Sequence, residues 1–596
     1  MRRQLTLWAL TLCGLAFIFF GVGLFFIGTP AYAQDDIDLE DAEYVGAREC
    51  ASCHRALLRD HGESRHALTL QDVSRDEDLI LGDFEQGEDV RTVQFPDDDE
   101  PRPFDADDIA YAVGTGRSVQ RYLYEVDRNE YMLLPAQWNV NTQSWEPYTL
   151  AEEWPDDAYA FGPNCAGCHT TGIDTRRFRW EDDGVQCESC HGPGSLHVEA
   201  ADDDEDVELI RAAIVLSPDP QICGQCHSRG TEPEDGLPYP AEYRPGQGDL
   251  LDEDVFALVP PDDPAHWYAS GHASQKYMQF NESLLSSHST ALASMLESEF
   301  ADDSCLQCHS GDFAFVQRLI ARHEDDDREG DPPEPLTTET AQFGVVCTSC
   351  HNPHAEAGEF PAHLWNDAYT LCADCHSNPA EGDFIHHPSR EMFEGIALVS
   401  EIEGVPSAHF SEEEGPRCAT CHMPDVLVEN AGIRNSHRWT PILPGSDEEL
   451  QDSCTTCHTD FVDVAGMQQL IEDIQTSTQA RLEAGQAALT GSNPEWVGAA
   501  LDFVEGDGSL GIHNYPYTEA LLKAVEGELS LAPTPIAEAD VGALLNVPPP
   551  PEDTIQTEPF TGEIRGGLTA PSIVLLGIAG LIIAVAAYAF FFRRPR

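Results

Sequence analysis

Positive charge is scarce in this chain of 596 residues, which has 32 Lys and Arg residues against 106 Asp and Glu residues and a formal net charge of −74. Only two residues are lysines, Lys276 and Lys523. Because binding to a phosphate backbone requires basic patches, this composition excludes nucleic acid as a partner. A basic redox partner could use the acidic field. Acidic, lysine-poor surfaces also suit high salt, where screening weakens such steering.

Methionine is rare as well, with seven residues, and only one cysteine, Cys13, lies outside a single repeated pattern. The other 18 cysteines form nine Cys-x-x-Cys-His runs. This pattern is the attachment signature of haem c, in which both thiols form thioethers and the histidine binds the iron as its proximal ligand. Paired cysteines also bind zinc or form disulfides, but neither use requires a histidine after every pair. The sequence therefore predicts nine covalently bound haem c groups.

The predicted attachment and ligand residues follow directly from the nine runs. The cofactor-binding cysteines are Cys50, Cys53, Cys165, Cys168, Cys187, Cys190, Cys223, Cys226, Cys305, Cys308, Cys347, Cys350, Cys372, Cys375, Cys418, Cys421, Cys454 and Cys457. The proximal iron ligands are His54, His169, His191, His227, His309, His351, His376, His422 and His458.

Fourteen further histidines could supply the second axial ligand of each iron. From their placement beside the runs or in a repeated Ser-x-His, we predict as distal ligands His66, His197, His272, His354, His409, His437 and His513. The histidines that we expect to be bystanders are His61, His266, His323 and His363. Two imidazole ligands favour a low reduction potential, whereas a methionine ligand raises it. With so few methionines, we expect low-potential haems.

Both ends of the chain contain long apolar runs. The first run precedes Ala31-Tyr32-Ala33 and predicts a secretory signal peptide over residues 1–33. The alternative is an uncleaved membrane anchor, since the run is long enough to span a bilayer. The second predicts a transmembrane helix over 571–592, with an arginine-rich cytoplasmic tail at 593–596. A Pro-rich linker is expected at 531–570. We therefore expect a single-pass cell-membrane protein with its haem body on the periplasmic or extracellular side.

Nine haems in roughly 500 residues leave too little chain for an ordinary apolar core. We expect a mainly α fold with long loops and little sheet, wrapped around stacked haems. The Ser-x-His sequences that end at His66 and His272 are each followed by three haem runs, which indicates an internal duplication. This predicts an N-terminal four-haem domain at 34–260 and a C-terminal five-haem domain at 261–530.

The order of motifs in the C-terminal half resembles that of the pentahaem cytochrome c nitrite reductases and their multihaem relatives. The resemblance rests on five haem runs and on the segments between them, which are His272-Ala273, Asn352-Pro353-His354, His387-Pro388, Ser436-His437 and Gly511-Ile512-His513-Asn514. The N-terminal half resembles the cytochrome c554 family in its first Ser-x-His and in the segment from Cys187 to His197. Both resemblances imply closely packed haem pairs, and the first implies that His272, His409, His437 and His513 are distal ligands.

The departures from the reductases bear on function. In the reductases the first haem usually has lysine in place of the motif histidine, but this chain has His309 there. The reductases also carry a tyrosine after the third haem, and no tyrosine is evident between Ser377 and Phe384. We therefore predict an electron-transfer cytochrome of a respiratory chain, whose partners are redox proteins or a quinol-linked membrane complex; self-association into a homo-oligomer is also considered. The alternative is a nitrite, hydroxylamine or sulfur-oxyanion oxidoreductase with its active iron at the Cys305–His309 haem and His387 or His288 as proton donor.

Overall fold

The computed structural model describes residues 38–532, except residues 97, 326–330, 355–360, 379–384, 412–414, 429–431 and 459–462. All of these described residues belong to one compact unit, Met1–Leu545. The predicted signal peptide, transmembrane helix, cytoplasmic tail and most of the predicted linker lie outside them. Within the described part, no helix has both the length and the apolar character that a membrane crossing requires. The prediction of a single-pass membrane protein is corrected accordingly, in its fold class and its localisation.

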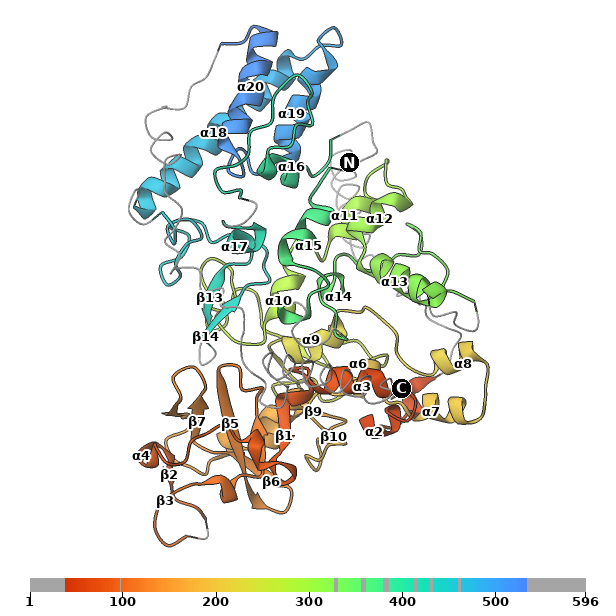
Figure 1. Cartoon of the computed structure of the whole chain (residues 1–596), viewed down its shortest axis with the longest axis vertical. Helices are drawn as coiled ribbons and strands as arrows, with labels where there is room; N and C mark the ends of the chain where they lie inside the picture. The colour runs from red at the N-terminus through yellow and green to blue at the C-terminus, as the bar shows by residue number, and fades with distance from the viewer. Residues whose placement is uncertain are drawn as a thin grey trace, which may run out of the picture. The chain divides into compact units, whose positions relative to one another are not determined.

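A six-stranded antiparallel sheet lies between the first and second haem runs and contradicts the expectation of a mainly α fold with little sheet (Figure 1). Its strands, in spatial order, are β1 (Leu70–Asp72), β4 (Tyr111–Val113), β5 (Val119–Asp127), β7 (Ala136–Asn139) and β8 (Ser144–Pro147), and β6 (Glu130–Leu133) pairs with β5. Four two-stranded sheets complete the strands: β2 (Thr92–Val93) with β3 (Arg102–Pro103), β9 (Thr170–Thr171) with β10 (Asp182–Asp183), β11 (Gly230–Thr231) with β12 (Ala257–Leu258), and β13 (Asp425–Val428) with β14 (Gly432–Asn435).

The large sheet has a protein core on each of its faces. Successive side chains of a strand point to opposite faces, and the neighbouring residues Tyr122 and Leu123 of β5 accordingly enter two different apolar clusters. Both residues are fully buried. One cluster also contains Trp138 and Trp145, and the other contains Phe161. This part of the chain therefore has an apolar core made by its own side chains, contrary to the expectation that haem alone would fill the interior.

Short helices form most of the segments that contain the haem runs. Eight of the nine runs end in or overlap α2 (Ala47–Cys50), α5 (Gly167–His169), α6 (Cys187–His191), α9 (Gln221–His227), α12 (Leu306–His309), α14 (Cys347–Cys350), α15 (Ala368–Cys375) and α17 (Cys418–His422), and the run at Cys454 forms turns. Between them lie α3 (Arg55–Gly62), α4 (Glu88–Arg91), α7 (Ser195–Asp202), α8 (Val207–Ala212), α10 (Gln279–Leu284), α11 (Ala291–Leu296), α13 (Gly311–Asp325) and α16 (Ser389–Glu394).

Three longer helices follow the last run: α18 (Val464–Ala488), α19 (Glu495–Asp507) and α20 (Tyr515–Leu529). In α18 the apolar residues Met467, Ile474 and Leu482 recur at helical spacing and are buried. The three helices share an apolar cluster with residues around α16. Inside the bundle, Arg481 of α18 forms a buried ion pair with Glu526 of α20, with Nε and Oε1 2.7 Å apart.

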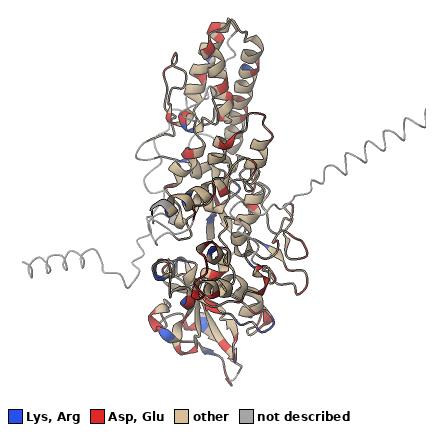
Figure 2. Ribbon diagram, turned by 90° about the vertical axis from the view of Figure 1, so that its right-hand side faces the viewer, with Lys and Arg blue, Asp and Glu red and all other residues tan. Residues whose placement is uncertain are grey.

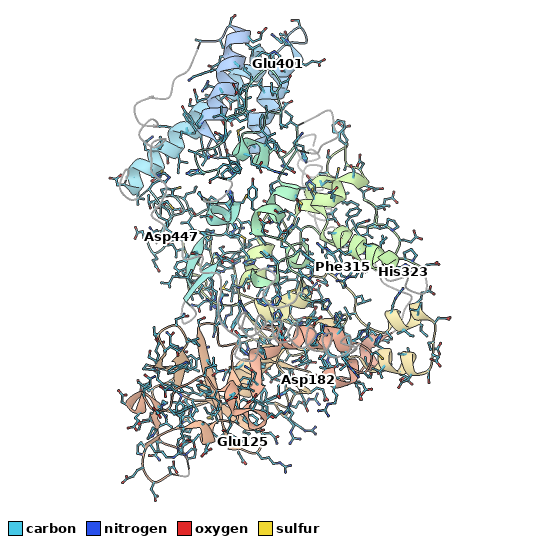
Figure 3. The ribbon with its side chains drawn as sticks, in the orientation of Figure 1. Glu125, Asp182, Phe315, His323, Glu401 and Asp447 are labelled. Carbon is cyan, nitrogen blue, oxygen red and sulfur yellow. The ribbon has the colours of Figure 1, made fainter. Side chains whose placement is uncertain are left out.

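Acidic side chains are spread over the described elements and outnumber basic ones throughout (Figure 2). Some of them have structural roles beside the haem runs. Asp182, labelled in Figure 3, accepts a hydrogen bond of 2.7 Å from the backbone N–H of Ala47, at the start of the first motif helix. Asp447, labelled in the same figure, accepts one of 2.9 Å from the backbone N–H of Ser270. These carboxylates connect segments that are far apart in the sequence.

Candidate haem-binding array

The nine Cys-x-x-Cys-His runs are numbered here as sites 1 to 9 in chain order. Sites 1 to 9 begin at Cys50, Cys165, Cys187, Cys223, Cys305, Cys347, Cys372, Cys418 and Cys454, respectively.

Most of the motif histidines are oriented by a hydrogen bond from Nδ1. The Nδ1 atom of His191 lies 2.7 Å from the carbonyl oxygen of Val215, that of His351 lies 2.8 Å from that of Ala362, and that of His309 lies 3.2 Å from that of Ala291. An imidazole that donates from Nδ1 has its Nε2 lone pair free for a metal. These rings are therefore prepared to bind iron through Nε2.

Eight of the nine motif histidines face a second histidine ring, with ring centroids 5.9–6.3 Å apart. In the order of the sites, the pairs are His54 with His197, His191 with His354, His227 with His66, His309 with His386 or His387, His351 with His437, His376 with His288, His422 with His513 and His458 with His409.

This spacing matches two imidazoles on opposite sides of one iron. A ligating imidazole nitrogen lies about 2 Å from its metal and about 1 Å from the centre of its own ring, so two trans rings have centres about 6 Å apart. Burial also lowers the pKa of His66, His354 and His437 to about 4. These rings are therefore neutral at pH 7, which is the form that binds a metal. The residues present thus fit haem iron with two histidine ligands at eight sites.

Six of the seven histidines that the sequence predicts as distal ligands occupy these pairs, and His272 does not. The ring of His272 is fully buried, and both its nitrogens are engaged: Nδ1 lies 3.1 Å from Ser270 Oγ and Nε2 lies 3.0 Å from the carbonyl oxygen of Thr440. It therefore has no nitrogen to offer to an iron. Among the expected bystanders, His61 is bonded at both nitrogens, and His266 Nδ1 pairs with Asp263 at 3.0 Å.

At sites 5 and 7 the structure brings forward histidines other than the seven predicted distal ligands, and two of them, His288 and His387, are those predicted as candidate proton donors. His288 faces the motif histidine of site 7, and His386 and His387 both face His309 of site 5. The rings of His386 and His387 have centroids only 3.9 Å apart, and His387 has a positive φ of 51°. A reductase would need an iron at site 5 with no second protein ligand. The imidazoles of His386 and His387, which face His309, argue against such an open iron. A count of open iron positions against spare histidines could have drawn attention to this pair.

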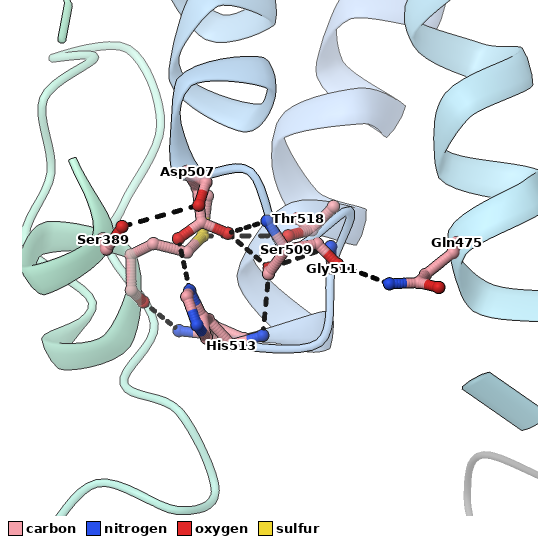
Figure 4. Close-up of polar contacts among 9 residues, drawn as sticks. Ser389, Gln475, Asp507, Ser509, Gly511, His513 and Thr518 are labelled. Atoms are coloured by element: carbon pink, nitrogen blue, oxygen red, sulfur yellow. Dashed lines mark hydrogen bonds and ion pairs between the residues drawn. The ribbon is translucent and has the colours of Figure 1, made fainter. Parts of the chain in front are cut away.

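At site 8 a carboxylate lies next to His513, the histidine that faces His422 (Figure 4). Asp507, at the end of α19, is fully buried, and its Oδ1 lies 2.7 Å from Nδ1 of His513. Although burial lowers the pKa of His513, the hydrogen bond to Asp507 and its charge raise that pKa above the usual value. The carboxylate itself is fixed by Ser509, whose hydroxyl donates to Oδ2. Such a carboxylate orients a ligating imidazole and makes it a stronger electron donor.

Cysteine thiols of different sites meet in pairs across the structure. Direct contacts between thiols link site 1 to site 3, site 2 to site 4, site 4 to site 6, site 5 to site 7 and site 7 to site 8, through the pairs Cys50–Cys187, Cys168–Cys226, Cys223–Cys347, Cys308–Cys375 and Cys372–Cys418. At longer range, thiols of site 3 and site 4, of site 6 and site 7, and of site 8 and site 9 raise one another's pKa, through Cys190 with Cys223, Cys350 with Cys372 and Cys457 with Cys421. The thiols that neighbour one another in this way place the motif runs in the order 1–3–4–6–7–8–9, with run 2 beside run 4 and run 5 beside run 7.

Site 2 is the exception to the histidine pairs. All 23 histidines of the chain lie in its described part, and none of their rings faces His169. The nearest aromatic ring is that of Phe161, at 6.3 Å between centroids. Nδ1 of His169 lies 3.3 Å from the carbonyl oxygen of Thr69. Burial lowers the pKa of His169, and the positive charges of Lys276 and Arg121 lower it further.

Family models match two segments of the chain. The model of the doubled CXXCH motif matches residues 340–381, and the model of cytochrome c554 and c-prime matches residues 139–192. The chain is a multihaem c-type cytochrome. Among curated proteins, none matches this cytochrome. The resemblance of both halves to multihaem cytochromes, stated from the sequence, is confirmed.

Solved structures similar to this cytochrome are also multihaem proteins. The outer cell wall cytochrome OcwA is 26% identical, with a TM-score of 0.66 over 82% of this chain and 99% of that one. The undecahaem cytochrome from the S-layer of Carboxydothermus ferrireducens is 19% identical, with a TM-score of 0.52 over 85% of this chain and 71% of that one. The octahaem sulfite reductase MccA of Wolinella succinogenes is 15% identical, with a TM-score of 0.37 over 82% and 83% of the two chains, which is too low to support an argument.

Proposed function

We propose that this cytochrome transfers electrons along nine covalently bound haems, eight of which have two histidine ligands. The haem attachment residues are the 18 motif cysteines, and the proximal ligands are the nine motif histidines. The distal ligands are the paired histidines described above, with His386 or His387 at site 5. Ligation by two imidazoles closes an iron to other ligands and favours a low potential, which suits a one-electron carrier.

The contacts between thiols of neighbouring sites are the observation that supports this function most. Together with the thiol pairs at longer range, they link the nine sites into one network whose main line contains seven sites, from site 1 at α2 to site 9 before α18. In such a network electrons pass directly from one fixed haem to the next, and no carrier molecule has to diffuse between them. When haem is bound, it supplies the redox-active iron; the chain's own residues fix the rings, exclude water from them and set their potentials.

We infer that the haem body works in the outer cell envelope. The similar structures are named as an outer cell wall cytochrome and an S-layer cytochrome, and haem-binding thiols of this kind belong outside the cytoplasm. The partners we propose are redox proteins or external electron acceptors, and self-association into a homo-oligomer stays a prediction. The four-haem and five-haem division at residue 260 also stays a prediction.

The experiment that tests this function counts haems and their ligation in the full-length protein. Intact mass together with a haem assay should give nine haems per chain. Low-temperature electron paramagnetic resonance (EPR) of the oxidised protein should show low-spin signals that integrate to eight haems. A haem count below nine, or high-spin signals at several sites, would contradict the proposal.

A further inference from the structure

Two side chains hold the motif run of site 6 at the same carbonyl group. Nη1 of Arg318, on α13, donates a hydrogen bond of 3.0 Å to the carbonyl oxygen of Thr348, and Nε1 of Trp365 donates one of 2.9 Å to that oxygen. Nη2 of Arg318 lies 3.5 Å from the carbonyl oxygen of Ser349. The backbone N–H of Trp365 donates a bond of 3.0 Å to the carbonyl oxygen of Cys350. The guanidinium is therefore fixed against the backbone between the two thiols of the run.

The charge of Arg318 has no bonded counter-ion in the described part of the chain. Its carbon Cζ lies 4.1 Å from the centre of the Trp365 ring, a favourable position for a cation. Burial lowers the pKa of Arg318, but an arginine stays charged at neutral pH. Asp312, the buried carboxylate of the same helix, instead accepts hydrogen bonds from the Ser310 hydroxyl and the backbone N–H of Gln342. A permanent cation is thus held beside site 6.

The segment that contains Trp365 is strained where it meets the motif histidine. Ala362 and His363 both have a positive φ of 55°, which is disfavoured for residues with a side chain. The carbonyl oxygen of Ala362 lies 2.8 Å from Nδ1 of His351, and that of His363 accepts a bond of 2.6 Å from the backbone N–H of Asn352. The strained residues therefore set both the ring of His351 and the position of Trp365, two residues further on.

Site 3, the corresponding run of the first repeat, has a neutral side chain in the same role. Sites 3 and 6 are the middle runs of the two groups of three that follow the Ser-x-His sequences. At site 3, Nε2 of Gln225 donates a hydrogen bond of 2.7 Å to the carbonyl oxygen of Ser189. Ser189 directly precedes the second thiol of its run, as Ser349 does at site 6. Since an amide is sufficient to hold such a run, the charge at site 6 is an addition that its local structure does not require.

We propose that Arg318 is a positioning residue that raises the reduction potential of the site 6 haem, because it holds a positive charge against the motif run. A cation nearby favours ferrous over ferric iron, since the ferrous form carries one positive charge less. This inference rests on the electron transfer proposed above and deepens it. Of the direct thiol contacts, the one between Cys223 and Cys347 joins sites 1 to 4 with sites 5 to 9. Arg318 thus sets how strongly an electron is held where the two groups of haems meet.

The test compares haem potentials of full-length, haem-loaded variants by potentiometric titration followed through optical and EPR spectra. Arg318→Gln replaces the guanidinium with the amide that site 3 has. It should keep nine haems and lower one potential. The ratio of reduced to oxidised haem at a fixed applied potential should fall about 3- to 10-fold, which is about 30–60 mV for one electron. Arg318→Lys keeps the charge and should retain most of the wild-type potential.

Matched variants assign the shift to site 6. Cys347→Ser with Cys350→Ser removes the site 6 haem, and in that background Arg318→Gln should move none of the eight remaining potentials. Arg322→Gln removes the same charge from an exposed position one turn later on α13, and it should shift the site 6 potential clearly less. Arg318→Met serves as a second uncharged variant if Arg318→Gln does not load nine haems.

Three results would overturn the role of Arg318. The first is a set of nine unchanged potentials in the uncharged variants. The second is a shift that persists in the background without the site 6 haem. The third is an equal shift in Arg318→Gln and Arg318→Lys, because the effect would then come from the shape of the side chain. Each of these leaves the proposed function intact, whereas a wild type with fewer than nine haems contradicts the proposed function itself.

Discussion

The carboxylate of Asp507 should hold the potential of the site 8 haem down. Its Oδ1 lies 2.7 Å from Nδ1 of His513, and Asp507 is fully buried. With about 2 Å from iron to the ligating nitrogen and about 2 Å across the ring, the carboxylate lies about 7 Å from the iron. At that distance and an effective dielectric constant of about 20, one negative charge favours ferric over ferrous iron by about 2 kcal/mol. This corresponds to about 100 mV for one electron.

Asp507→Asn keeps the shape of the side chain and removes its charge. We expect one of the nine haem potentials to rise by about 50–100 mV, while the others stay in place. Potentiometric titration followed by optical and EPR spectra measures this shift. Asp502→Asn is the matched control, because it removes the same charge from an exposed position of the same helix. An unchanged set of potentials in Asp507→Asn would refute the assignment of His513 as the distal ligand of site 8.

Three further predictions concern stability and ligation. Arg481→Met leaves Glu526 buried without its partner, so we expect a loss of about 3–5 kcal/mol in the helical bundle, seen as an earlier unfolding transition in thermal circular dichroism; an unchanged transition would contradict a buried pair. Trp138→Ala removes one of the largest buried side chains of the sheet and should cost about 3–5 kcal/mol, measured by urea unfolding followed through tryptophan fluorescence. His272→Gln should leave the haem count and EPR spectrum unchanged, since both ring nitrogens are bonded to the protein; a new high-spin haem would make His272 a ligand.

The cofactors could be predicted from the sequence because a covalent haem imposes a fixed local pattern. Two thiols and a histidine must follow one another within five residues, so the requirement is visible without the fold. The distal ligands come from elsewhere in the chain. His513, for example, lies 91 positions beyond His422 in the sequence and reaches it only because α18 and α19 fold back. Placement beside a run identifies six histidines that face motif histidines, but it also identifies His272, whose ring is hydrogen-bonded at both nitrogens.

The sheet and the cavity lined by Arg121, Lys276 and Arg434 could not be predicted in the same way. Except for β5, strands β4 to β8 have only three or four residues, and their burial depends on clusters that join residues from 70 to 166. Long-range packing of this kind overrides local propensity. The cavity depends on three segments around Arg121, Lys276 and Arg434 that are more than 150 residues apart in sequence. The rarity of lysine is visible in the sequence, but only the fold places Lys276 in a cavity with Arg121 and Arg434.

The continuity of the haem network is tested most directly by removing single haems at two different sites. Site 7 lies on the main line between sites 6 and 8, whereas site 5 lies beside it. Two variants each lose one haem: Cys372→Ser with Cys375→Ser at site 7, and Cys305→Ser with Cys308→Ser at site 5. Both should keep eight haems by mass. The measurement is the conductance of single full-length molecules held between two electrodes.

The account predicts that loss of the site 7 haem lowers the conductance by at least tenfold, because sites 8 and 9 are cut off from sites 1, 3, 4 and 6. Loss of the site 5 haem should leave the conductance close to that of the wild type. Equal conductance of the two variants would contradict a main line through site 7.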